Sequence, residues 1–352
     1  MPKNESRERC IYSTVDNLCD GTHPLHEKEH YLPAGLGEFA NDKRLRNKIC
    51  FRCQKDFGGL EDVFLHNSPE AFFRFLIGQR GRKREKKKNI FYEPTAKRPP
   101  LTITAKQPGE EYTVLWEMIS QKEAKPMNQM VFRDGHGEYH HLPYRPGEVS
   151  SEQVLEFVNN NKIAKPELIS YFFDNEESAN QIELACKDYM KGKSKEGKLS
   201  GGNVECEMKA EITVPYLRAL AKIAFHFVLA HFPFTGFEPE FDNIKRFIFW
   251  GHENYADFVQ QTQEQFIFDL QNPEAIMNNW SHFLSAEYDY NLIQVRMQFF
   301  AAPLLRPIIW KVVLGRSPSR VIGRNGKCYW YRYYDQRDAQ GHSGFMKELQ
   351  PS

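Results

Sequence analysis

The chain has 352 residues, of which 41% are hydrophobic and 14% aromatic, so it can bury a sizeable core and suggests about two domains. Its net charge of +1 hides an asymmetry, because residues 1–100 carry a net +6 and the remainder a net −5. A polyanion should therefore meet the N-terminal part first. Seven cysteines, with no charged-then-apolar leader before them, argue against a secreted disulfide framework.

The most apolar long stretch, 214–234, is interrupted by four basic or imidazole side chains, Arg218, Lys222, His226 and His231. It lacks the roughly 18 uninterrupted apolar residues of a membrane-spanning helix. We therefore expect no membrane partner, and a reducing cytoplasmic location that keeps the cysteines as thiols.

In chain order, residues 10–28 are irregular and rich in turn signals, and a short apolar segment follows at 30–36. Residues 45–49 lead into a Cys-x-x-Cys pair, and apolar residues at helical spacing come next. Ser68, followed by Pro69, then predicts the start of a second helix. The N-terminal part should thus contain a hairpin, a cysteine knuckle and two helices.

The proline-rich stretch 94–108 indicates a joint, so we expect one domain at 1–90 and a second at 91–352. Strand and helix patterns both occur in the second domain, and its late strands alternate apolar and polar residues. Thr213 predicts the start of its main core helix. The fold class is therefore α+β: a small zinc-stapled module, then a larger mixed domain with an antiparallel sheet. The expected elements are strands at 112–119, 129–132, 293–299, 308–314 and 327–334, and helices at 151–160 and 176–190.

Cys50 and Cys53 place two thiolates on one tight turn, where they can share a tetrahedral zinc ion with two further ligands. Those ligands should be Cys10 with Cys19, with His23 or His26 as a weaker alternative. A segment with so many turns has little core of its own, so bound zinc would stabilise it directly. Ordinary buried thiols are the alternative interpretation.

The motifs in this region are Cys10-Ile-Tyr, Glu29-His30-Tyr-Leu-Pro33, Leu36-Gly37, Asn47-Lys-Ile-Cys50-Phe-Arg-Cys53-Gln54 and Phe57-Gly58. Together they resemble the HNH endonuclease family, in the branch that writes its motifs as Glu-His-x-x-Pro and Cys-x-x-Cys-Asn. The resemblance covers about residues 10–65, under a fifth of the chain.

The resemblance implies a ββα-metal fold that binds one divalent ion, Mg²⁺ or Mn²⁺, at the scissile phosphate. His30 would act as the general base, since imidazole titrates near working pH. Glu29 would be an oxygen ligand of the ion. Asn47, or Asn41 in another register, would pin the two strands or assist the metal, and Gln54 would take the last motif position.

Two positions depart from the family pattern. Position 13 is Ser where the first knuckle has Cys, so Cys19 must replace it across a longer loop. Gln54 stands where Asn or His is usual, and its side chain is one methylene longer. The ion's ligands could then be completed from the following helix, by Asp56, Glu61 or Asp62.

A basic run after the module could neutralise several phosphates without reading sequence; its members are Arg80, Arg82, Lys83, Arg84, Lys86, Lys87 and Lys88. A solvated helix face or linker is the alternative. The histidines 136, 140 and 141 with Glu138 could bind metal, although hairpin-turn polarity explains them as well. Aromatic residues at 329–334 could stack bases, or form a strand covered on both faces.

Three functions follow from these observations. The first is metal-dependent hydrolysis of phosphodiester bonds in DNA, with RNA not excluded. The second is a zinc-stabilised nucleic-acid-binding protein whose nuclease site is degenerate. The third is an effector nuclease, of the toxin or defence kind, that the C-terminal domain regulates, and that domain could also form homo-oligomers.

Overall fold

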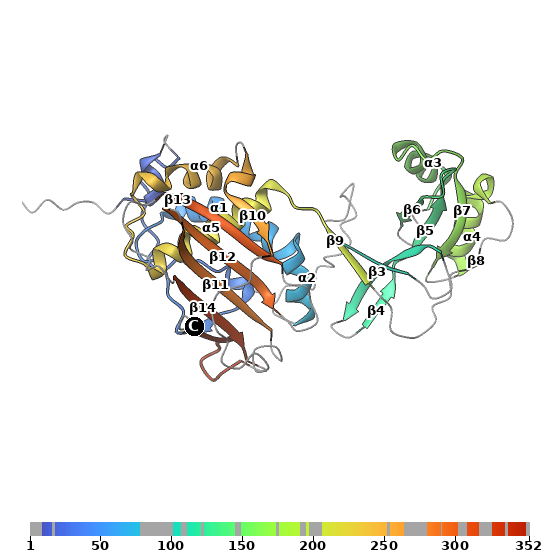
Figure 1. Cartoon of the computed structure of the whole chain (residues 1–352). Helices are drawn as coiled ribbons and strands as arrows, with labels where there is room; N and C mark the ends of the chain where they lie inside the picture. Colours follow the sequence, from blue (N-terminus) through green and yellow to red (C-terminus); the bar gives the residue numbers. More distant parts are fainter. Residues whose placement is uncertain are drawn as a thin grey trace, which may run out of the picture. The chain divides into compact units, whose positions relative to one another are not determined.

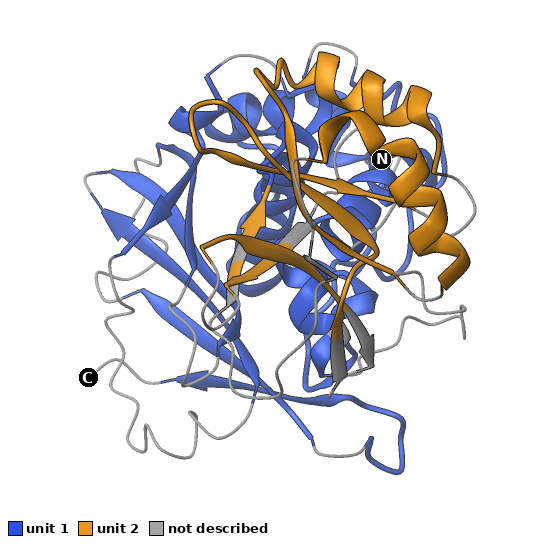
Figure 2. Cartoon of the chain, turned by 90° about the vertical axis from the view of Figure 1, so that its right-hand side faces the viewer, with its two compact units in different colours: residues 1–88, 211–352 blue, residues 89–210 orange. Residues whose placement is uncertain are grey.

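The structure is a computed structural model. It describes residues 9–15, 18–77, 101–106, 111–120, 123–144, 149–173, 176–190, 195–196, 206–251, 254–263, 280–289, 291–301, 308–316, 326–334 and 337–349. The chain is a mixed α+β protein, as the sequence predicts, and it divides into two compact units (Figure 2). Unit 1 comprises residues 1–88 and 211–352, and unit 2 comprises residues 89–210.

This division differs from the expected domains at 1–90 and 91–352. The first boundary lies near residue 90, but residues 211–352 form one compact unit with the N-terminal part. The reason is the apolar helix α5 (Val214–His231), which packs against α1 (Phe51–His66). Patterns within one segment of sequence do not show which distant segment will cover it.

Unit 1 contains a seven-stranded sheet in the order β1-β15-β14-β11-β12-β13-β10. All neighbours are antiparallel except the short pair of β1 with β15. The alternation of apolar and polar residues at 293–299 lies in β12, as predicted. The strands are β1 (Phe39–Ala40), β10 (Val259–Thr262), β11 (Ser281–Asp289), β12 (Leu292–Ala301), β13 (Ile309–Arg316), β14 (Lys327–Tyr333) and β15 (Gly344–Leu349).

Helix α5 is the centre of unit 1, and its neighbours are the sheet, α1 and α6 (Asp242–Trp250) (Figure 1). The hydroxyl of Thr213 caps its first turn, as predicted, by accepting a hydrogen bond from the Tyr216 N–H. Because these elements surround α5 on several sides, nearly all of its residues are buried. A helix that is apolar all round can be buried in this way. The short helix α2 (Pro69–Leu76) follows α1 and packs on β12.

Tyr31 attaches the N-terminal segment to the sheet. Its hydroxyl donates to Asp42 Oδ1 at 2.5 Å, so its oxygen accepts from the Tyr331 hydroxyl and from His231 Nε2 at 3.1 Å. Burial raises the pKa of Asp42 to about 7, although the hydrogen bond from Tyr31 opposes this shift. One buried hydroxyl therefore joins the N-terminal segment, α5 and β14.

Unit 2 contains two four-stranded sheets, β4-β3-β2-β9 and β6-β5-β7-β8. The buried Gln129 side chain connects them, because its amide accepts from Leu115 N and donates to Leu115 O. The elements are β2 (Leu101–Lys106), β3 (Thr113–Ser120), β4 (Glu123–Pro126), β5 (Gln129–Arg133), β6 (Tyr139–Pro143), β7 (Glu167–Phe172), β8 (Lys195–Glu196), β9 (Cys206–Ala210), α3 (Ser151–Asn160) and α4 (Glu176–Ala185).

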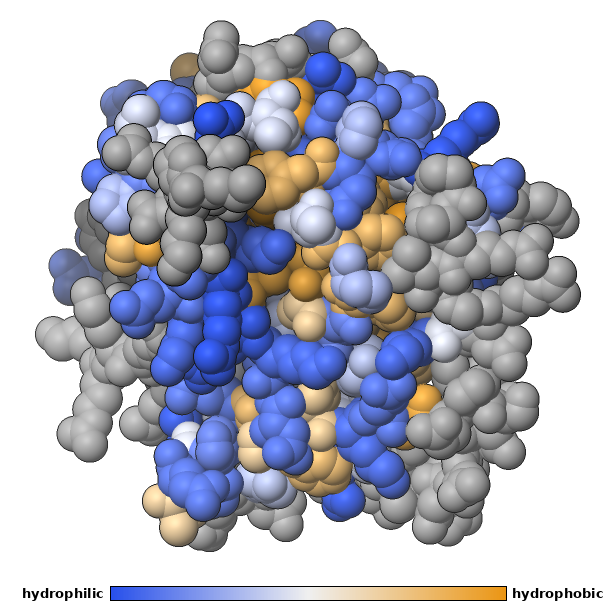
Figure 3. Space-filling model, turned by 90° about the vertical axis from the view of Figure 1, so that its left-hand side faces the viewer, coloured by the Kyte–Doolittle hydropathy of each residue, from blue (hydrophilic) through white to orange (hydrophobic). Residues whose placement is uncertain are grey.

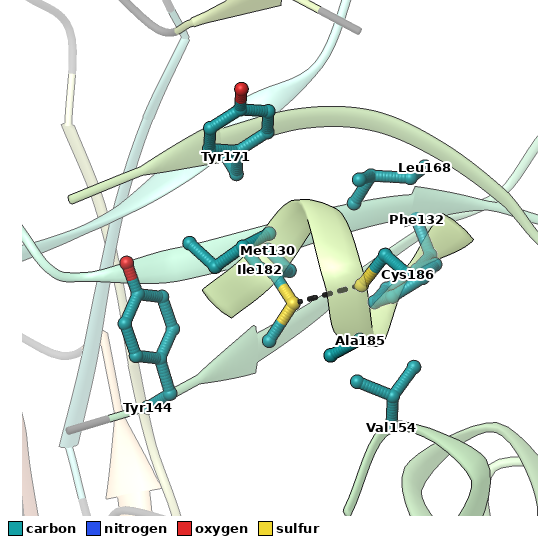
Figure 4. Packing of buried hydrophobic residues seen from close by; sticks show 9 residues of the cluster. All are labelled: Met130, Phe132, Tyr144, Val154, Leu168, Tyr171, Ile182, Ala185 and Cys186. Atoms are coloured by element: carbon teal, nitrogen blue, oxygen red, sulfur yellow. Dashed lines mark hydrogen bonds between the residues drawn. The ribbon is translucent and has the colours of Figure 1, made fainter. Parts of the chain in front are cut away.

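The second sheet of unit 2 packs against α3 and α4 through an apolar cluster (Figure 4). Val154 of α3 and Ile182 of α4 meet Met130, whose sulfur lies 3.3 Å from the Cys186 thiol. Cys186 is thus a core residue. A capping box between Ser150 and Gln153 starts α3.

Among the residues coloured in Figure 3, hydrophobic residues gather toward the middle of the view and hydrophilic residues surround them. Within the described ranges, no helix combines the length and the apolar character needed to cross a membrane.

The raised pKa of Asp42 predicts a pH-dependent stability. A carboxyl group whose pKa is higher in the folded state stabilises the fold when protonated, and this contribution is lost as the pH rises from about 4 through 7. Replacing Asp42→Asn keeps an acceptor for Tyr31 and should flatten urea-unfolding free energies between pH 5 and 8, a change of up to about 3 kcal/mol. Asp62→Asn, at an exposed carboxylate on α1, should keep the wild-type profile; an equally steep profile in Asp42→Asn would contradict the assignment.

Candidate functional site

Four cysteine side chains come together in unit 1. Cys10 precedes a short 3-10 turn, Cys19 lies in the loop after it, Cys50 caps α1 and Cys53 lies in the first turn of that helix. All four are buried, and their sulfur atoms lie within 4.8 Å of one another. The predicted ligand set is confirmed as a cluster that could hold a metal ion such as zinc.

The spacing of the sulfurs fits a tetrahedral ion. The Cys10 and Cys53 sulfurs are 3.8 Å apart, and those of Cys19 and Cys50 are 3.5 Å apart. Four ligands at a Zn–S distance of about 2.3 Å have sulfurs roughly 3.8 Å from one another. His23 and His26, the weaker alternatives, are not members of the cluster.

Backbone N–H groups already point at three of the sulfurs. Cys50 N donates to Cys10 Sγ at 3.4 Å, Gly21 N to Cys19 Sγ at 3.4 Å, and Cys53 N to Cys50 Sγ at 3.5 Å. Hydrogen bonds, the Cys53 thiol foremost, lower the pKa of Cys10 to about 6, whereas burial raises the pKa of Cys19 to about 12. Since a metal ion takes thiolates, binding would release protons from this cluster.

Ser13, the departure from the expected first knuckle, has a structural role. Its hydroxyl donates to the Cys10 carbonyl at 2.7 Å, and a side chain at Gly21 would approach its Cβ to 3.2 Å. Gly21 also has a left-handed φ of 70°, which suits glycine. The loop therefore turns tightly past Ser13 and brings Cys19 to the cluster in its place.

The cluster lies beside an antiparallel hairpin that leads into α1. Leu25 pairs with Cys50 and Glu29 pairs with Leu45, where both backbone hydrogen bonds are formed. Ile11 N donates to Lys48 O, which adds the N-terminal segment to the same hairpin. A knuckle and a helix follow one another as predicted, but the hairpin pairs residues 25–29 with 45–50 and does not lie within the turn-rich residues 10–28.

The Glu29 carboxylate has a partner that the sequence did not predict. Glu29 is only 5% exposed, and Lys222 Nζ of α5 lies 3.4 Å from its Oε1. Lys222 is fully buried and also donates to Glu61 of α1. Burial disfavours its charge, but attraction to Glu61 and Glu29 outweighs burial and leaves the pKa of Lys222 above its usual value.

The other expected catalytic residues lie in the hairpin region and in α1. His30 is half-buried directly after Glu29, and Gln54 is half-buried in the first turn of α1. Asn47 is exposed with a left-handed φ of 51°, and its N–H donates to His26 O across the hairpin. Asn47 thus pins the two strands through its backbone. Asn41, Asp56 and Asp62 are exposed.

Tyr12 makes a further buried polar contact with α5. The Tyr12 hydroxyl lies 2.8 Å from His226 Nε2, and burial lowers the pKa of His226 well below its usual value. Lys222 and His226 were noted in the sequence only as interruptions of an apolar stretch. Their spacing of four residues places them on one face of a helix, and this was the available signal that the face meets polar groups.

Other predicted features lie elsewhere. The basic run 80–88 is outside the described residues. Asp134, Glu138 and His140 converge in unit 2, but Asp134 Oδ1 accepts from the N–H groups of His136 and Glu138, as a polar hairpin turn does. His141 binds the Thr113 carbonyl instead.

Comparison with known proteins gives no family for this chain: no family model, no curated protein and no solved structure matches it. The chemistry of the described residues therefore carries the functional argument.

The cysteine cluster predicts one tightly bound zinc ion per chain. Cys50→Ser should lose the metal and leave residues 10–66 protease-sensitive, because the metal contributes directly to folding. Metal content by mass spectrometry and limited proteolysis check this. Cys328→Ser, at a buried thiol outside the cluster, is the control and should retain the metal; retention by Cys50→Ser as well would refute the site.

The ion pairs of Lys222 predict a large stability effect. Lys222→Met leaves two carboxylates without their cation and should lower the unfolding free energy by about 3–5 kcal/mol, measured by urea denaturation. Adding Glu29→Gln to that variant should restore part of the loss. Lys55→Met, at an exposed lysine on α1, should change stability by less than about 0.5 kcal/mol. If Lys222→Met and Lys55→Met changed stability equally, the ion pairs of Lys222 would contribute little to the unfolding free energy.

Proposed function

We propose that this chain is a metal-dependent endonuclease of the HNH type that hydrolyses phosphodiester bonds in DNA. One observation supports the proposal: four thiols converge at the point where a hairpin leads into α1. The hairpin bears Glu29 and His30, and the helix bears Gln54. The motifs that resemble the family are therefore parts of one folded module.

His30 is the proposed general base. Imidazole accepts a proton near neutral pH, so it can take one from a water molecule that attacks the phosphorus atom. His30 is half-buried, whereas Glu29 beside it is buried. Adjacent residues of an extended segment point in opposite directions, which supports separate roles for the two side chains.

A divalent ion such as Mg²⁺ or Mn²⁺, when bound, would offset the charge that builds on the phosphate and the leaving oxygen. Glu29 does not fit a ligand role as it stands, because Lys222 already neutralises it in a buried position. Gln54, with Asp56 of the same helix, offers oxygen atoms that are more accessible.

A second candidate is a zinc-stabilised nucleic-acid-binding protein with a degenerate nuclease site. The ion pair between Lys222 and Glu29 favours it, because it uses the motif's carboxylate for packing. In this case the cysteine cluster would support a binding surface and no hydrolysis would occur.

Plasmid cleavage separates the two candidates. Purified protein is incubated with supercoiled plasmid and Mg²⁺ or Mn²⁺, beside His30→Ala. Loss of the general base should lower the nicking rate at least about 100-fold. His23→Ala, at an exposed histidine of the same module, should cut like wild type. If no protein cuts but all retard DNA in a gel, the second candidate replaces the first.

A further inference from the structure

The two faces of the seven-stranded sheet differ in what they contact. Tyr329 of β14 lies against Phe227 of α5, and Trp310 of β13 lies against Tyr216, so these side chains mark the helix-covered face. Residues of the opposite parity point the other way. We call this second side the outer face; its central members are Phe283, Trp330, Phe345, Arg332 and Lys347.

An aromatic row crosses the outer face over β11, β14 and β15. Phe283 lies opposite Trp330, and their rings are parallel within 10° with centroids 6.5 Å apart. The Trp330 ring meets Phe345 edge-on at 5.7 Å, and Phe345 lies 5.9 Å from Tyr334. Phe283 and Trp330 are buried, Phe345 is half-buried, and Tyr334 is 37% exposed. The row thus ends in two aromatic rings that solvent can reach.

Cations flank the same row. The guanidinium of Arg332 lies 5.8 Å from the centroid of the Trp330 ring, and the exposed Lys347 lies opposite Trp330 on β15. Further along the outer face, the carboxylate of Glu287 is 3.2 Å from Arg296. The guanidinium of Arg296 offsets the negative charge of Glu287. Among the described residues, the charged side chains named beside the aromatic row are therefore cations.

We propose that the outer face binds single-stranded nucleic acid, with bases stacked on Tyr334 and Phe345 and phosphates held by Arg332 and Lys347. Unpaired bases can place their rings on aromatic side chains, whereas the bases of a duplex are already stacked on each other. Lysine and arginine supply the charge that tracks the backbone. This inference rests on the proposed function, which it refines by naming a single-stranded substrate region.

Binding is measured in the His30→Ala background without added divalent ion, so that cleavage does not interfere. The probes are fluorescein-labelled 20-mers of deoxythymidine and of uridine, and a 20-base-pair duplex, followed by fluorescence anisotropy. We expect at least one single strand to bind ten times more tightly than the duplex, and the stronger of the two identifies DNA or RNA. Equal or tighter duplex binding would overturn the proposal.

One double variant and one single variant, each with a control, locate the site. Phe345→Leu with Tyr334→Leu keeps apolar volume but removes the rings, and should weaken single-strand binding at least tenfold. Lys347→Gln should weaken it less and reduce its salt dependence. The matched controls, Tyr255→Leu and Lys187→Gln, alter an exposed aromatic and an exposed cation elsewhere and should bind like the background protein.

The outcomes separate this inference from the nuclease proposal. Unchanged binding in the aromatic pair, with its melting temperature retained, refutes the outer face whether or not the wild type cuts plasmid. Lost binding in that pair, together with no plasmid cleavage by wild type, supports the outer face and refutes the nuclease. If the aromatic pair unfolds, Lys347→Gln alone decides, because Lys347 is exposed at the sheet surface.

Discussion

A charged lysine at the centre of an apolar helix is the constraint on which unit 1 depends. Lys222 has no exposed surface, so its ammonium is tolerated only beside opposite charge. Glu29 of the hairpin and Glu61 of α1 provide that charge, and both belong to the N-terminal segment. The segment must therefore lie on α5 in one orientation, which also sets Tyr12 on His226 and Tyr31 on His231.

Two kinds of contact thus hold the cysteine module. Its thiols bring residues 10–19 to the start of α1, and buried polar pairs join the module to α5. The same pairs bear on the chemistry, because Glu29 cannot serve an ion and Lys222 at once. In the proposed nuclease, catalysis would therefore depend on His30 and on oxygen donors of α1.

Much of this arrangement could be predicted where the signal was local. Cys50 and Cys53 are three residues apart, and the alternation in β12 spans seven residues, so short-range geometry was enough. The partners of Lys222 could not be predicted, since Glu29 lies 193 residues away in the sequence. The residues next to Lys222 and next to Glu29 carry no pattern that indicates which distant residue each would contact. The division into units was missed for the same reason, because the cover for α5 comes from the start of the chain.

The separation of these partners has a consequence for biosynthesis. The ribosome completes Glu61 161 residues before Lys222, a delay of roughly 8 to 30 s at ordinary elongation rates. During this interval the nascent hairpin can acquire metal, but its two carboxylates have no buried cation to meet and its apolar surface has no helix to cover it. Unit 2 emerges meanwhile and has its own core. Translation thus gives this chain a waiting period, in which a chaperone would find the cysteine module before its partner helix exists.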